Sequence, residues 1–163
     1  ESSSLSSPTI KGECLMENLV KEKGISQKKI FLNKNITKDH FIIERKQEYA
    51  GTHILLDLWS TDFKNSIRSL KKIIKEAIDI SGATLLHMHL HRFGKDQGIS
   101  GVAVLAESHI SIHTWPERGY IAFDIFMCGD TNPQAAAEYL IEKLKAKKKI
   151  IKEIKRGVTK IVK

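Results

Sequence analysis

The chain has 163 residues, of which 41% are apolar and 28% charged, and its net charge at pH 7 is +8. This length and composition are typical of one folded domain with a small appendage, and they exclude a wholly disordered protein. No run approaches about 18 apolar residues, which excludes a membrane-spanning helix, and two cysteines, Cys14 and Cys128, are too few for a disulfide framework. With no secretory signal pattern at the N-terminus, we expect a protein of the reducing cytoplasm without a membrane role.

The positive charge is concentrated near the C-terminus. Residues 131–163 hold ten lysines and arginines against three acidic residues, a net charge of +7, whereas residues 51–130 hold eight against nine. Nucleic-acid-binding proteins usually spread basic residues along a face or intersperse them with stacking aromatics, and the lysine cluster at 145–149 contains no aromatic residue. We interpret this cluster as a solvated helix end followed by an edge strand, and we expect no nucleic-acid partner.

The first 48 residues differ in character from the rest. They begin with the serine-rich stretch ESSSLSSPT, and beyond a possible short helix at 15–23 they alternate lysine and asparagine with short apolar groups. We predict that residues 1–48 form a partly disordered extension of unknown role and that a compact domain occupies residues 49–163.

Strand and helix patterns alternate within the compact domain. Apolar alternation predicts strands over 52–59, 84–92, 99–106, 108–114, 120–127 and 149–155. Helical spacing predicts one helix over 63–80, with an N-cap among residues 60–62, and a second over 134–146 after Asn132 and Pro133. The resulting order, β-α-β-β-β-β-α-β, predicts an α+β fold: a two-layer α/β sandwich, with a largely antiparallel sheet carrying both helices on one face.

Three histidines, His87, His89 and His91, alternate in the second predicted strand and therefore point to one face of it. Three imidazoles on one face can hold zinc. No cysteine pair and no His-Glu-x-x-His helix supports such a site, so we expect no metal.

Reactive residues are densest between residues 98 and 129. Ser100 does not form a nucleophile elbow, because Val102 stands where that motif requires glycine. Cys128 and His113 form a candidate thiol–imidazole pair, although Cys128 also suits an ordinary small core position. The residues alone therefore indicate a candidate enzyme that uses serine, histidine and cysteine.

Several motifs in and around this segment resemble those of the prokaryotic S-adenosylmethionine decarboxylase proenzymes, a self-processing family with a covalent pyruvoyl cofactor. The motifs are Glu107-Ser108-His109, His113-Thr114-Trp115-Pro116-Glu117, Asp124 through Cys128-Gly129, His91-Arg92-Phe93, Gly98-x-Ser100-Gly101, and Gly51-Thr52-His53 through Asp57-x-Trp59. The resemblance covers about residues 49–157 and leaves residues 1–48 without a counterpart.

The resemblance implies self-cleavage between Glu107 and Ser108. It implies that Ser108 becomes the pyruvoyl group, which forms a Schiff base with the substrate, while Ser100 and His113 assist processing, His113 as the proton acceptor. Strict alternation along a strand puts Ser108 and His113 on opposite faces. We therefore expect a strained turn at 107–108 that changes this relation.

The resemblance also implies the substrate-binding residues and the assembly. Cys128 is the implied proton donor, Glu117 binds the ribose hydroxyls of S-adenosylmethionine, Phe93 stacks on its adenine, and Tyr49 is a second candidate aromatic. The product is the aminopropyl donor for spermidine synthesis. A homodimer with sites at or near its interface is expected, because helices on one face of a sheet leave the other face to be buried.

Three alternatives remain open. A pyruvoyl-dependent arginine or ornithine decarboxylase on this scaffold needs a carboxylate aimed at a distal cation, which Glu117 or Asp57 can supply. Arg118, where the family commonly has tyrosine, blurs the match at this point. A partner subunit unable to process is disfavoured by the intact reactive residues, and a basic binding module would use the C-terminal lysines instead.

Overall fold

The computed structural model describes residues 40–61 and 63–161. Cys14, the short helix expected at 15–23 and the rest of the predicted extension up to residue 39 lie outside the described residues. The compact unit begins at His40. Within the described ranges, no helix is long and apolar enough to cross a bilayer.

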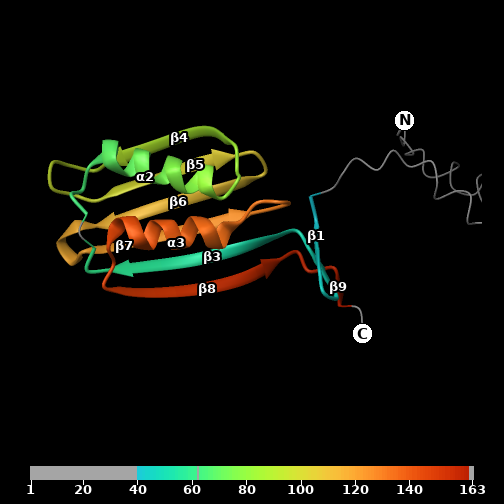
Figure 1. The fold of residues 1–163 in the computed structure, drawn as a ribbon. Coiled ribbons are helices and arrows are strands. Elements are labelled where there is room, and N and C mark those ends of the chain that lie inside the picture. Colours follow the sequence, from blue (N-terminus) through green and yellow to red (C-terminus); the bar gives the residue numbers. More distant parts are fainter. Residues whose placement is uncertain (1–39, 62, 162–163) are drawn as a thin grey trace, which may run out of the picture. The chain divides into compact units, whose positions relative to one another are not determined.

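A six-stranded sheet forms the centre of the fold (Figure 1). Its strands are β3 (Gly51–Trp59), β4 (Leu85–Arg92), β5 (Ile99–Leu105), β6 (Ser108–Trp115), β7 (Tyr120–Met127) and β8 (Lys148–Arg156). They lie in the order β4-β5-β6-β7-β3-β8, and every neighbouring pair is antiparallel. All six strands predicted from the sequence are present.

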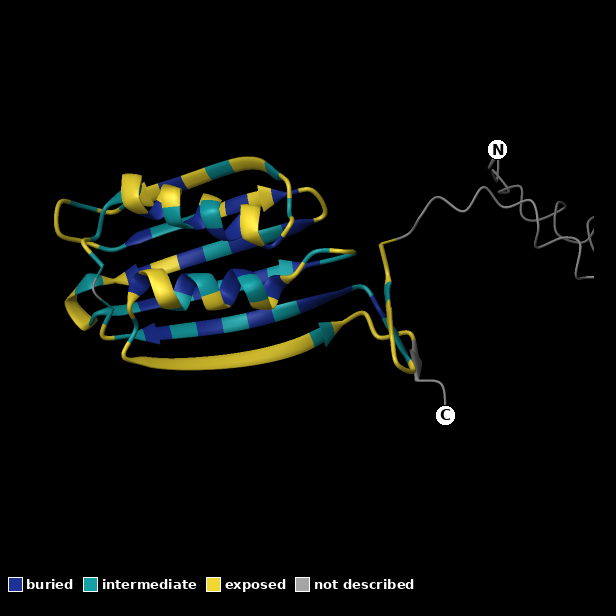
Figure 2. Cartoon of the chain, in the orientation of Figure 1, coloured by how far each residue is buried: buried dark blue, intermediate teal, exposed yellow. Residues whose placement is uncertain are grey.

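Two helices, α2 (Ile67–Ile80) and α3 (Pro133–Leu144), cover one face of this sheet (Figure 1). Their inward side chains pack with alternate residues of the strands. Figure 2 shows buried positions alternating along the central strands and recurring along both helices. The buried helical residues are Leu70, Ile74, Ala77 and Ile78 on α2 and Ala136, Ala137, Leu140 and Leu144 on α3. The predicted two-layer α+β sandwich is therefore confirmed.

The two helices differ in how well the sequence predicts where they begin. As predicted, Asn132 caps α3: its side chain accepts a hydrogen bond from the backbone N–H of Ala135 at 3.0 Å. The N-cap predicted for α2 among residues 60–62 is wrong, because α2 begins later and Ser66 caps it. Thr61 instead donates through its backbone N–H and its hydroxyl to the carbonyl oxygen of Gly119.

A small second sheet crosses the predicted domain boundary. It consists of β1 (Ile42–Glu44), β2 (Gln47–Tyr49) and β9 (Lys160–Ile161), in the order β1-β2-β9. Whereas the sequence places the start of the compact domain at Tyr49, the compact unit of the structure starts at His40 and includes this hairpin. The strands have three residues or fewer, too short for alternation to reveal them.

The face of the large sheet away from the helices, called the open face here, carries polar, aromatic and exposed aliphatic side chains. It is formed by His87, His89 and His91 of β4; Ser100, Val102 and Val104 of β5; His109, Ser111, His113 and Trp115 of β6; Tyr120, Ala122, Asp124 and Phe126 of β7; His53, Leu55, Asp57 and Trp59 of β3; and Lys148, Ile150, Lys152 and Ile154 of β8. Four of its aliphatic side chains are 37–44% exposed, Val102, Val104, Ile150 and Ile154.

Candidate active site

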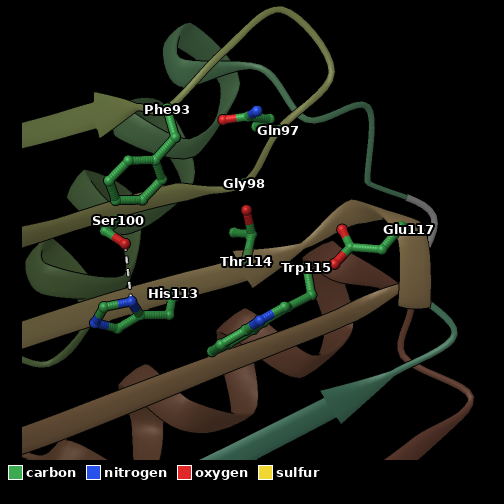
Figure 3. Close-up of a pocket in the computed structure, with 8 residues that line it drawn as sticks. All are labelled: Phe93, Gln97, Gly98, Ser100, His113, Thr114, Trp115 and Glu117. Atoms are coloured by element: carbon green, nitrogen blue, oxygen red, sulfur yellow. Dashed lines mark hydrogen bonds between the residues drawn. The ribbon is translucent and has the colours of Figure 1, made fainter.

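A pocket of about 260 Å³ opens beside the β4–β5 loop and the end of β6 (Figure 3). Four predicted site residues line it together, Phe93, Ser100, His113 and Glu117. The remaining lining residues are Gln97, Gly98, Thr114 and Trp115. The sequence motifs before and after β5 thus meet at one place, because β5 and β6 are neighbouring antiparallel strands.

Ser100 and His113 form a hydrogen-bonded pair within this pocket. They lie directly opposite each other in the β5–β6 register, and the Ser100 Oγ is 2.8 Å from the His113 Nδ1 (Figure 3). The pair is on the open face, and its hydrogen-bond direction depends on the imidazole tautomer. An imidazole joined to a hydroxyl in this way can accept or return a proton at a reacting group.

The pocket floor depends on a close approach of two strands. A Cβ atom added to Gly98 would lie 2.1 Å from the carbonyl oxygen of Thr114, so no other residue fits there without displacing backbone. The Ile99 N–H donates to the Thr114 hydroxyl at 2.8 Å, which fixes the start of β5. The loop then closes with a hydrogen bond from the Phe93 N–H to the carbonyl of Gly98.

Trp115 is a pocket residue to which sequence reasoning assigned no role, although it belongs to the quoted motif at 113–117. Its ring stacks on Tyr120, which stacks on Trp59, with centroid separations of 5.0 and 4.2 Å. The Tyr120 hydroxyl donates to Asp57 at 2.5 Å, and burial together with this carboxylate raises the pKa of Tyr120 to about 12. Asp57 therefore has a partner on the open face and does not line the pocket.

Ser108 and Cys128 form a second group. Ser108 is buried, and its Oγ accepts a hydrogen bond from the backbone N–H of Cys128 at 3.3 Å. Burial, and secondly the charge of Glu107, raises the pKa of the Cys128 thiol. A thiol with a raised pKa is protonated at neutral pH, which suits a proton donor.

The turn that precedes Ser108 is strained, as the sequence predicts. Glu107 has a φ of 63°, in the left-handed region that costs about 1–2 kcal/mol for a residue other than glycine. Ala106 and Glu107 join β5 to β6, since Leu105 pairs directly with Ser108. The strain therefore falls on the residue whose carbonyl would be attacked during cleavage.

The expectation that this turn changes the relation of Ser108 to His113 is wrong. Ser108 shares the buried face of β6 with Ile110 and Ile112, whereas His113 is on the open face. The chain reverses within the two-residue turn, so β6 alternates regularly from its first residue. His113 is five positions after Ser108, about 17 Å along a strand.

The two groups therefore lie at opposite ends of β6. His113 pairs with Ala122, six residues before Cys128, so the thiol–imidazole pair considered from the sequence is not formed within one chain. Tyr49 is likewise distant from the Phe93 pocket. It is buried, donates its hydroxyl to Glu44 at 3.1 Å, and lines a separate polar pocket with Gly129.

The histidines of β4 point to the open face, as predicted. Among residues 40–61 and 63–161, no three or more histidine, cysteine or acidic side chains are grouped in a way that could hold a metal ion. His91 instead contacts Phe93 edge to face, with ring centroids 5.2 Å apart.

Fold and site together define a class: a two-layer α+β protein whose strands present a serine after a strained turn, a protonated thiol and a serine–histidine pair. Residues 52–157 match the family model for S-adenosylmethionine decarboxylase. The chain belongs to this family, which confirms the resemblance seen in the sequence.

Named relatives agree with this assignment. The chain is 45% identical over 113 residues to the S-adenosylmethionine decarboxylase proenzyme of Methanococcus aeolicus, covering 68% of this chain and 96% of the relative. It is 47% identical over 110 residues to the proenzyme of Prochlorococcus marinus, covering 66% and 87%. The crystal structure of the adenosylmethionine decarboxylase from Aquifex aeolicus superposes with a TM-score of 0.62 at 31% identity, covering 68% of this chain and 93% of that one.

Proposed function

We propose that this chain is a proenzyme that cleaves itself between Glu107 and Ser108 and then decarboxylates S-adenosylmethionine, supplying the aminopropyl donor for spermidine synthesis. The observation that carries the proposal is the left-handed Glu107 directly before a Ser108 hydroxyl that rests against the Cys128 amide. Family membership and the relatives named as proenzymes support it.

The cleavage uses groups of the chain itself. The Ser108 Oγ attacks the Glu107 carbonyl carbon, the C–N bond breaks, and the hydroxyl proton passes to the new amine. Loss of the Ser108 α-proton to a base and departure of Glu107 as a carboxylate leave a dehydroalanine. The imine tautomer of this dehydroalanine takes up water and releases ammonia, which leaves the pyruvoyl group. Strain at Glu107 favours the first step, because ester formation releases it.

The residues present fit a pyruvoyl group at position 108, because the Cys128 backbone already contacts this residue. When formed, that group supplies an electron-withdrawing carbonyl for the loss of carbon dioxide. The protonated Cys128 thiol then delivers a proton to the substrate α-carbon. Phe93 stacks on the adenine, and Glu117 accepts hydrogen bonds from the ribose hydroxyls.

A complete site requires two copies of the chain. The nucleoside-binding pocket and Ser108 lie at opposite ends of β6, about 17 Å apart along the strand. We place two copies with their open faces stacked and a two-fold axis between them, perpendicular to the strands. The strands of the two copies then run in opposite directions, so the pocket of one copy lies over the Ser108 end of its partner. The exposed aliphatic side chains of the open face provide apolar surface for such a homodimer.

Self-cleavage is tested on the purified chain by intact mass and denaturing gel. The expected products are residues 1–107 and a C-terminal fragment of residues 108–163 that is blocked to Edman sequencing. The Ser108→Ala chain should remain whole. A fully active chain that is never cleaved would overturn the proposal.

Release of labelled carbon dioxide identifies the substrate. We expect release from S-adenosylmethionine and none from arginine or ornithine. Release from arginine or ornithine alone would retain the cleavage chemistry but replace the substrate, with Glu117 then facing the distal cation.

A further inference from the structure

His40, which precedes the family match at residues 52–157, lies against the proposed cleavage site. Its Nδ1 is 2.8 Å from the Oε2 of Glu107, the residue before the scissile bond. Its carbonyl oxygen accepts a hydrogen bond from the Gly129 N–H at 3.1 Å. One residue of the N-terminal segment therefore contacts both chain segments that build the Ser108 site.

The contact with Glu107 restrains the conformation on which the attack depends. The φ angle of Glu107 helps to set the position of its carbonyl carbon relative to the Ser108 hydroxyl, and this φ lies in the unfavourable left-handed region. The Glu107 side chain is half exposed, so burial does not fix it. The imidazole N–H is the anchor that the structure provides for this carboxylate.

The contact between His40 and Gly129 bears on the position of the Ser108 hydroxyl, the attacking group. Gly129 has a φ of 61°, and a Cβ added there would lie 3.3 Å from the His40 Nδ1, so the two residues are tightly apposed. The preceding residue, Cys128, donates its N–H to the Ser108 Oγ. Holding Gly129 therefore also holds the amide that orients the attacking hydroxyl.

We propose that His40 is a positioning residue for self-cleavage: it holds Glu107 in the left-handed conformation that presents its carbonyl carbon to Ser108. The inference rests on the proposed cleavage between Glu107 and Ser108. It assigns a role in processing to a residue outside the family match at 52–157.

The test follows cleavage of freshly translated full-length chain over time by denaturing gel. His40→Ala should slow cleavage on the order of tenfold, which corresponds to about 1.4 kcal/mol in the barrier. His40→Asn should recover most of the rate, because its amide N–H lies near the position of Nδ1. The matched control is Lys72→Ala, an exposed residue on α2 away from the open face, which should cleave at the parental rate.

A second measurement separates positioning from folding. In the uncleavable Ser108→Ala background, His40→Ala should leave Tm unchanged, since exposed ion pairs contribute little to stability. The inference is overturned if His40→Ala cleaves at the parental rate, or if His40→Asn recovers none of the lost rate. A large fall in Tm for His40→Ala would also overturn it. If the parent chain itself stays whole, the proposed function fails first.

Discussion

The thiol of Cys128 is partly buried beside Ser108, next to the Glu107 carboxylate, and both features raise its pKa. Because the thiolate is the form that reacts with iodoacetamide, we predict that alkylation of Cys128 begins at higher pH than that of a free cysteine. The measurement is the alkylation rate against pH in a Cys14→Ser, Ser108→Ala chain, which keeps one thiol and an intact backbone.

Removing the Glu107 charge provides the control for this titration. Glu107→Gln in the same background should shift the alkylation profile to lower pH, but only partly, because burial is the larger cause of the raised pKa. If the alkylation rate of Cys128 rises at the same pH as that of N-acetylcysteine in the same buffer, or at a lower pH, the assignment of Cys128 as a protonated donor is contradicted.

Phe93 and Glu117 carry the prediction about substrate binding. Phe93→Ala should lower kcat/KM for S-adenosylmethionine. The loss of transition-state stabilisation should be about 1–3 kcal/mol, the usual cost of a lost base-stacking contact, and self-cleavage should be unaffected. Glu117→Gln should also weaken turnover of the nucleoside. The control is Leu86→Ala, which removes an exposed side chain of β4 outside the pocket. Equal kcat/KM in the parent and both pocket variants would exclude these roles.

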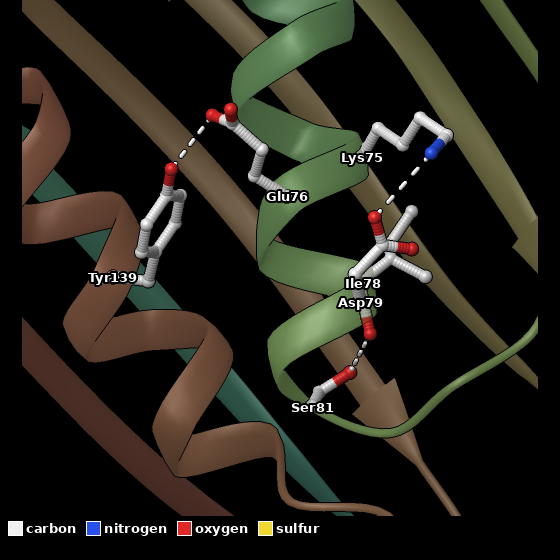
Figure 4. A network of polar contacts seen from close by, with 6 residues as sticks. All are labelled: Lys75, Glu76, Ile78, Asp79, Ser81 and Tyr139. Carbon is white, nitrogen blue, oxygen red and sulfur yellow. Dashed lines mark hydrogen bonds and ion pairs between the residues drawn. The ribbon is translucent and has the colours of Figure 1, made fainter.

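Between α2 and α3, a polar contact supplements the apolar core (Figure 4). The Tyr139 hydroxyl of α3 donates to Glu76 of α2 at 2.6 Å, and burial with this carboxylate raises the pKa of Tyr139 to about 12. At the end of α2, the Ser81 hydroxyl donates to the carbonyl of Ile78 at 2.7 Å. The first bond joins α3 to α2, and the second closes the last turn of α2.

Three substitutions rank the forces that hold the helix layer. Ile74→Ala, in the core, should lower the free energy of unfolding by about 2–5 kcal/mol. Tyr139→Phe should cost about 1 kcal/mol, because it removes one hydrogen bond and little packing. Lys75→Ala, which breaks an exposed pair with Asp79, should cost about 0–0.5 kcal/mol. Urea unfolding of the Ser108→Ala chain measures all three, and a Tyr139→Phe cost as large as that of Ile74→Ala would contradict this order.

The basic C-terminal cluster follows from the position of its strand. β8 is an edge of the sheet, with β3 as its partner, and the lysines at 148 and 149 begin it. Charged side chains on an edge strand disfavour pairing with a strand of another molecule. The interpretation of this cluster as an edge strand is thus confirmed.

At the scale of the whole molecule, the proposed homodimer predicts complementation between two variants of low activity. Cys128→Ala and Glu117→Gln remove residues from the two ends of the molecule. If each site combines the Cys128 of one copy with the Glu117 of the other, a mixed dimer holds one intact site. Co-expression should then restore about a quarter of parental activity, given random pairing of two-fold dimers.

Separate purification and mixing without subunit exchange provide the control, since activity should not rise above that of the separate variants. Failure of co-expressed variants to recover activity, when mass spectrometry shows mixed dimers, would place each site within one copy. Sedimentation of the active protein only as an 18 kDa species would exclude the dimer itself.

Local patterns in the sequence determined most of the fold. Alternation predicted all six strands of the large sheet, and Asn132 with Pro133 predicted the start of α3, because these signals depend on neighbours a few residues away. Short motifs also named four residues that line one pocket in the structure, Phe93, Ser100, His113 and Glu117. The start of α2 was missed because Thr61 binds Gly119, a residue far along the chain.

Only the tertiary structure decided how the site residues are grouped. The β5–β6 register joins Ser100 to His113 and, by the same regular alternation, keeps His113 at the far end of β6 from Ser108. The contact of His40 with Glu107 likewise spans residues far apart in the sequence. Pairing register and contacts between distant segments depend on how the whole chain packs, and no short window of sequence contains that information.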